Sequence, residues 1–187
     1  MSKSLAQEQL QFEVWIEGHH SALYKHALWM TGRSDVANDC VQETYFQAWK
    51  DRKALKDKEK VLPWLLTILR RTVYRVYSQR TNESMFVPEQ FVDIVDPREM
   101  KDHESLLDLI SAMRGLSEMH REVILLYGLH GLSYTEISRV LEIPAGTVMS
   151  RISRARSALD SALNSEPGYS DENGVISFIA KGRNSNE

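Results

Sequence analysis

The chain has 187 residues and a mass of 21.5 kDa, and its 42% hydrophobic and 26% charged residues are ordinary for a folded globular protein. The formal net charge is -3; no apolar run reaches the roughly 18 residues of a transmembrane helix, and no apolar signal core follows Met1. The single cysteine, Cys40, excludes an internal disulfide and a multi-cysteine zinc site. We therefore expect a cytoplasmic protein without membrane insertion.

Three amphipathic helices are predicted in the N-terminal part, because apolar residues recur there at spacings of three and four. The first ends near residues 31–33, and Ser34 is predicted to cap the second, which runs to about Lys50. A loop over residues 51–60 follows, and Pro63 is predicted as the first residue of the third helix. The apolar faces are Phe12, Ile16, Leu23, Ala27 and Met30, then Val36, Ala37, Cys40, Val41, Tyr45 and Ala48, then Leu62, Leu65, Leu66, Leu69, Val73, Val76 and Tyr77.

Periodicity lapses over residues 81–104, which read as a flexible acidic linker, and returns over residues 105–163. Ser117 is predicted to cap one helix, and Ser133 with Glu136 forms the capping-box pattern of another. A last helix follows the turn at residues 142–144. Residues 164–187 read as a tail in which disorder is expected, the alternative being that residues 175–179 dock on either domain and regulate it. The fold class is thus all-α, with residues 5–80 and 105–163 forming two small helical domains.

The segment 133–159 has the pattern of a helix-turn-helix, whose second helix carries small and basic residues on its outer face. Hydroxyl and backbone N–H groups near the start of that helix suit a phosphate, and arginines one turn apart suit guanine edges or phosphates. The candidate duplex-contacting residues are Ala145, Thr147, Ser150, Arg151 and Arg154. A plain helical hairpin with a solvated arginine face remains the alternative.

The third helix interleaves basic and aromatic residues opposite its apolar stripe, and lysines precede it in the loop. Arginines neutralise phosphates while rings stack on unpaired bases, so this pattern suits single-stranded nucleic acid. The candidate residues are Lys53, Lys56, Trp64, Arg70, Arg71, Tyr74 and Arg75. The alternative is that Trp64 and Tyr74 belong partly to the core and that the arginines are merely solvated.

Charge is distributed unevenly along the chain. Residues 50–80 carry 10 basic and 3 acidic side chains, a net charge of +7, whereas residues 81–118 carry 3 and 9, a net charge of -6. We expect residues 83–104 to mask the basic faces in the free protein, so that neutralising them raises the affinity for DNA.

The outer face of the second helix, with Asp39, Gln42, Glu43 and Phe46, suits either a protein-binding surface or an ordinary solvated face. Enzyme chemistry finds no support, because the sequence has no Gly-rich phosphate loop, no nucleophile elbow and no His-Glu-x-x-His motif. The six histidines have no metal-ligand spacing. We therefore expect a protein that is not an enzyme and that needs no cofactor or metal.

Taken together, these motifs resemble the extracytoplasmic-function group of the sigma-70 family of bacterial transcription initiation factors. Residues 39–45 (DCVQETY), with Trp64, Leu65 and the basic helix, are similar to sigma region 2. Residues 121–123 (REV), 131–137 (GLSYTEI) and 144–151 (PAGTVMSR) are similar to sigma region 4. The likeness covers roughly residues 10–80 and 105–163, in the family's order, and does not reach the tail.

The resemblance implies a sigma subunit that binds core RNA polymerase through Asp39, Gln42, Glu43 and Phe46. It implies that the loop and third helix melt and capture the -10 element, and that the helix-turn-helix docks on the -35 element through the residues given above. Core polymerase, promoter DNA in duplex and melted form, and an anti-sigma factor are the partners it implies. A conventional helix-turn-helix regulator and a sigma-like decoy or interaction module remain alternatives.

Four residues depart from the family's pattern. Arg71 and Arg75 stand where the family often has Asn and Asp, and Ser138 and Glu142 stand where it usually has a small Ala and a turn Gly. We expect Glu142 to leave the left-handed conformation that Gly accepts.

Overall fold

The computed structural model describes residues 2–79 and 103–164, and every element in these two ranges is a helix. The chain divides into two compact units, residues 1–85 and residues 86–187. Two expectations lie outside the described residues. One is the masking by residues 83–104, of which only the last two are described, and the other is the disorder of the tail beyond Asn164. The prediction of an all-α fold is confirmed.

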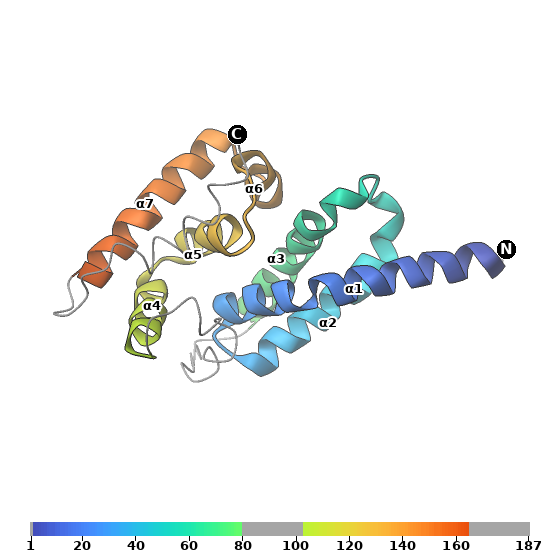
Figure 1. Ribbon diagram of the computed structural model, residues 1–187, viewed down its shortest axis with the longest axis horizontal. Helices are drawn as coiled ribbons and strands as arrows, with labels where there is room; N and C mark the ends of the chain where they lie inside the picture. The colour runs from blue at the N-terminus through green and yellow to red at the C-terminus, as the bar shows by residue number, and fades with distance from the viewer. Residues whose placement is uncertain (1, 80–102, 165–187) are drawn as a thin grey trace. The chain divides into compact units, whose positions relative to one another are not determined.

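The first unit consists of α1 (Ser2–Thr31), α2 (Ser34–Asp51) and α3 (Val61–Gln79), which pack on one another in Figure 1. Two 3-10 turns, Arg52–Ala54 and Lys58–Lys60, occupy the connection between α2 and α3. Most residues of the predicted apolar faces meet in the core, where Leu23, Cys40 and Leu69 have no exposed surface. The exceptions in the described part of the chain are half-buried: Ile16, Tyr45, Leu62 and Val76. Trp29 and Thr44 are buried as well, although the sequence pattern did not place them there.

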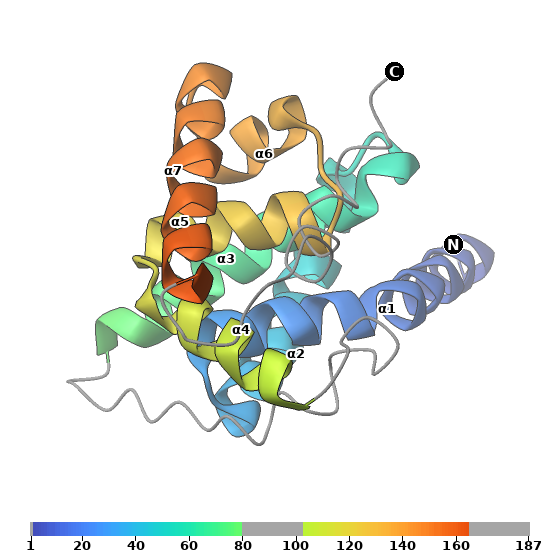
Figure 2. The ribbon, with the colours of Figure 1, turned by 60° about the vertical axis from the view of Figure 1, so that its left-hand side comes forward.

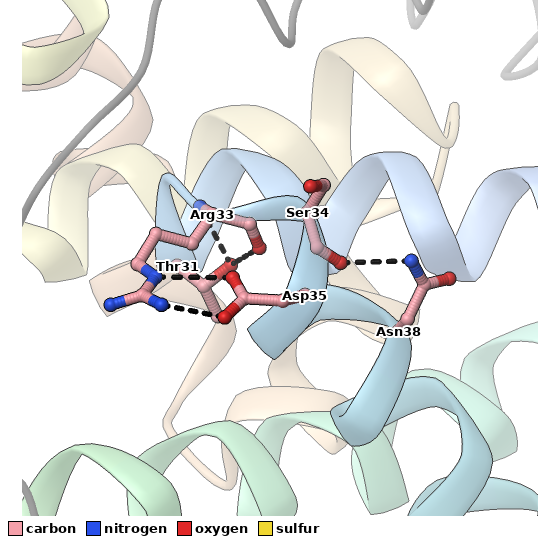
Figure 3. A network of polar contacts seen from close by, with 5 residues as sticks. All are labelled: Thr31, Arg33, Ser34, Asp35 and Asn38. Carbon is pink, nitrogen blue, oxygen red and sulfur yellow. Dashed lines mark hydrogen bonds and ion pairs between the residues drawn. The ribbon is translucent and has the colours of Figure 1, made fainter.

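The connection between α1 and α2 differs from the prediction, because Ser34 is the first residue of α2 and not its cap. Arg33 takes the extended cap position without a capping side-chain bond, and Gly32 turns the chain with a φ of 69°. Thr31 stabilises the junction instead: its hydroxyl accepts from the Arg33 N–H at 3.4 Å (Figure 3). The same hydroxyl donates to the Ala27 carbonyl at 2.8 Å. The Arg33 guanidinium pairs with the Asp35 carboxylate beside it (Figure 3).

The start of α3 also differs from the prediction, because the helix begins at Val61 and Pro63 is its third residue. The first four N–H groups of a helix have no acceptor within it, so a proline is tolerated anywhere in this turn. Pattern alone therefore could not locate the boundary.

The second unit consists of α4 (His103–Gly115), α5 (Glu118–Ile124), a π-helical turn (Leu125–Leu129), α6 (Tyr134–Leu141) and α7 (Ala145–Asn164). Figure 2 shows α5 and α6 beside α7, whose apolar face closes the core with Val148, Ile152 and Leu159. The Ser117 hydroxyl accepts the His120 N–H, as predicted. The capping box is confirmed: Glu136 accepts the Ser133 N–H at 2.9 Å, and Ser133 accepts the Glu136 N–H at 3.3 Å.

Candidate nucleic-acid interface

The helix-turn-helix consists of α6, a turn over residues 142–144 and α7, as the sequence predicts. The expectation for Glu142 is wrong, because this residue keeps the left-handed conformation with φ 56° and ψ 41°. Ser138 supplies the reason. Its carbonyl accepts the N–H groups of Glu142 and Ile143, and its hydroxyl donates to the Ile143 carbonyl at 2.5 Å. Ser138 and Glu142, the two departures from the family's pattern in this motif, are therefore joined by hydrogen bonds in one turn.

The outer face of α7 presents short side chains and arginines. Ala145, Ser150 and Arg154 are exposed, and Thr147 and Arg151 are half-buried. The Ser150 hydroxyl donates to the Thr147 carbonyl at 3.0 Å. Met149, which the sequence pattern did not single out, is 54% exposed beside them and adds an apolar surface. An apolar contact of this kind suits the methyl group of thymine.

An aromatic and cationic cluster lies behind the motif. The rings of Tyr127 and Tyr134 stack with centroids 5.6 Å apart, and the Arg156 guanidinium lies 4.9 Å from the Tyr127 ring. His130 follows the π-helical turn, and burial lowers its pKa to about 4. The second unit therefore holds a neutral imidazole near pH 7.

The basic face of α3 is partly engaged within the first unit. Trp64 is half-buried and meets Trp15 of α1 edge to face, with centroids 6.3 Å apart, which agrees with the alternative that Trp64 belongs partly to the core. Arg70 lies over the Tyr74 ring at 4.9 Å, while Arg71 is exposed. This face offers a cation over a ring and exposed guanidinium groups, which are the groups that phosphates and bases contact.

The predicted surface of α2 adjoins this basic face. Arg75 of α3 pairs with Glu43 of α2 at 3.2 Å. Hydrogen bonds from Gln47 and from Arg75 hold the pKa of the Glu43 carboxyl below its usual value. Phe46 is 54% exposed, and the Lys50 ammonium lies 3.8 Å from the centre of its ring. Asp39 and Gln42 are exposed on the same helix.

The cations of the α2–α3 loop, residues 52–60, fall into two groups: those with a partner in the first unit and those without an ion pair among the described residues. Arg52 pairs with Glu8, Lys58 donates to Gln11, and Lys60 pairs with Asp57 at 3.0 Å. Lys53 and Lys56 are exposed, and neither forms an ion pair within the described part of the chain. The two lysines that the sequence selected are thus the ones open to an external anion.

Over residues 2–79 and 103–164, no group of three His, Cys, Asp or Glu side chains is arranged to hold a metal ion. None of the helices in these ranges has the length and apolar character needed to cross a membrane.

Each of the two units matches a known protein family. The family model "Sigma-70 region 2" matches residues 15–83, and "Sigma-70, region 4" matches residues 106–159. The chain is 30% identical over 168 residues to the ECF RNA polymerase sigma factor SigL of Mycobacterium tuberculosis, covering 85% of this chain and 92% of that one. It is 28% identical to the ECF RNA polymerase sigma factor EcfG of Rhodopseudomonas palustris, covering 76% and 79%.

A solved structure agrees with these matches. The sigma factor RpoE of Bartonella quintana, in complex with the anti-sigma factor NepR, superposes with a TM-score of 0.62 at 27% identity. The match covers 88% of this chain and 98% of that one.

Proposed function

The chain belongs to the extracytoplasmic-function group of the sigma-70 family and is a sigma factor of transcription initiation, and from this premise we propose how its surfaces divide the work. The unit with α1, α2 and α3 binds core RNA polymerase and captures the unpaired -10 element. The unit with α6 and α7 binds the duplex -35 element. The protein catalyses nothing itself and works with the polymerase in the cytoplasm.

One observation carries this division: exposed cations without ion pairs lie on both units of the same chain. Lys53 and Lys56 are exposed on the α2–α3 loop, and Arg154 is exposed on α7, with no ion pair to any described residue. A conventional duplex-binding regulator needs only the cations on α7. Two sets, on units similar to region 2 and region 4, suit a protein that holds a duplex at one point and a melted strand at another.

The proposed residue roles divide among three surfaces. Asp39, Gln42 and Phe46 are exposed on α2 and form, with Glu43, the proposed polymerase contact. The proposed -10 contacts are Lys53, Lys56, Trp64, Arg70, Arg71, Tyr74 and Arg75, and the proposed -35 contacts are Ala145, Thr147, Ser150, Arg151 and Arg154. An anti-sigma partner is proposed by analogy with the complex of RpoE and NepR.

Run-off transcription on a pool of promoter fragments, with core polymerase and with or without this protein, tests the proposal. We expect core-dependent, sequence-selective transcripts whose start sites define both promoter elements. The double variant Lys53→Ala/Lys56→Ala is expected to lose transcription from duplex promoters while keeping affinity for core polymerase, because both lysines belong to the α2–α3 loop and not to the proposed polymerase contact on α2. Duplex binding without transcripts would instead establish the conventional regulator, and inactivity in both assays would favour the decoy.

A further inference from the structure

The first residues of α1 precede the part of the chain that the region 2 family model matches. The region 2 match begins at residue 15, whereas α1 begins at Ser2. We call residues 2–14 the α1 extension. In Figure 1 these turns continue beyond the end of α2, towards the side on which the chain crosses from α2 to α3.

The α1 extension contacts the α2–α3 loop at two points. The Glu8 carboxylate accepts hydrogen bonds from Nε and Nη2 of Arg52 at 3.0 and 2.9 Å. The Gln11 amide oxygen accepts from the Lys58 ammonium at 3.2 Å. Both contacts join residues more than forty positions apart, so they form only when the unit is folded.

Arg52 is held on three sides, which makes it part of the scaffold. Its guanidinium lies 4.0 Å from the Trp49 ring, and Nη1 donates to the Trp49 carbonyl at 2.8 Å. With Glu8 on the remaining side, its side chain is only 18% exposed. A guanidinium committed in this way does not serve a phosphate, although it belongs to the basic loop.

The two loop residues that contact the α1 extension flank two exposed lysines. Lys53 and Lys56 lie between Arg52 and Lys58 in the loop and are both exposed. Residues of the extension and of the loop together line a cavity of about 360 Å³, among them Gln7, Lys53 and Leu55. The loop is therefore held by α1 on both sides of the two exposed lysines.

We propose that the α1 extension is a positioning element for the -10 strand, in which Glu8 and Gln11 fix the α2–α3 loop so that Lys53 and Lys56 meet the melted DNA in one arrangement. Fixing a residue's backbone costs about 1–2 kcal/mol. A loop ordered in the free protein does not meet that cost when DNA binds. The inference rests on the proposed function of this loop.

Electrostatics alone predicts the opposite result, which makes the idea testable. Glu8 is an anion beside the proposed path of a polyanion, so removing its charge would raise DNA affinity if charge were all that mattered. Loss of positioning would lower selective capture of the strand instead.

The test uses the full chain assembled with core polymerase on promoters whose -10 positions are randomised. The variants are Glu8→Ala, Gln11→Ala and their double; Glu13→Ala is the matched control, since Glu13 is exposed on the same helix and forms no ion pair among the described residues. We expect the double variant to lose about fivefold in discrimination between the best and worst -10 sequences, the size of effect typical of a weak ion pair or hydrogen bond. Affinities for core polymerase and for the -35 duplex are expected to stay unchanged, and Glu13→Ala to match the wild type.

The results distinguish failure of this inference from failure of the proposed function. If the double variant matches Glu13→Ala, or gains strand capture, the positioning role is overturned while the sigma activity of the wild type stands. An inactive wild type would overturn the proposed function and this inference with it. The tryptophan emission melt reports the stability of the first unit, and if the double variant is unfolded at the assay temperature, the milder Glu8→Gln is compared with Glu13→Gln in the same way.

Discussion

The turn of the helix-turn-helix offers a prediction in which two substitutions act in opposite directions. Glu142 holds a φ of 56°, a conformation that costs a residue with a Cβ about 1 kcal/mol and costs glycine little. Glu142→Gly is therefore expected to stabilise the second unit by about 0.5–1 kcal/mol. For a domain of roughly 60–100 residues this is a rise in Tm of about 2–8 °C.

Ser138→Ala works against this gain, because it removes the hydroxyl that donates to the Ile143 carbonyl at 2.5 Å. Loss of one hydrogen bond costs about 1 kcal/mol, and the better helix propensity of alanine returns a few tenths. The double variant restores the residues usual in the family and is expected to melt within about 2 °C of the wild type.

The assay exploits the distribution of tryptophan in the chain. All four tryptophans, Trp15, Trp29, Trp49 and Trp64, lie in the first unit, so their emission reports that unit alone. Far-ultraviolet circular dichroism reports the helices of both. We expect the single variants to shift the dichroism transition in opposite directions and to leave the emission transition in place. Destabilisation by Glu142→Gly would refute the reasoning, because it would mean that the contacts of the Glu142 side chain outweigh the backbone strain.

Three other predictions follow from burial and charge. Because burial lowers the pKa of His130 to about 4, below its usual 6.5, the folded state binds fewer protons than the unfolded chain between these values. Stability from this group is present above about pH 6.5 and is lost as the pH falls towards 4, so acidification from pH 7 to 5 should lower the dichroism transition that tryptophan emission does not report, and His130→Gln should weaken that dependence. Leu69→Ala, at a fully buried position, is expected to cost about 2–5 kcal/mol and to lower the emission transition without moving the second unit; a shift below about 1 kcal/mol would contradict its place in the core. Arg154→Ala should weaken binding to -35 duplex and reduce the slope of log K against log salt concentration by about one, as measured by fluorescence anisotropy; an unchanged slope and affinity would remove Arg154 from the interface.

Local signals in the sequence were enough for most of the helices and for part of the helix-turn-helix. Ser117 and the pair Ser133 and Glu136 cap helices as predicted, because a cap depends on residues three positions apart. The apolar spacing of α3 and α7 identified the buried face for the same reason. These signals did not locate the helix boundaries, since Ser34 and Pro63 are both compatible with several positions in a first helical turn.

The partners of charged side chains were decided only by the tertiary structure. Nothing near Arg52 in the sequence indicates Glu8 as its partner, and Arg75 meets Glu43 because α3 packs on α2. Trp64 carried two interpretations until the position of Trp15 brought their rings together. Composition and spacing thus determined which residues could bind nucleic acid. The packing of elements distant in sequence decided which cations are committed to the fold and which, such as Lys53 and Lys56, remain exposed, because that choice depends on contacts that no local pattern encodes.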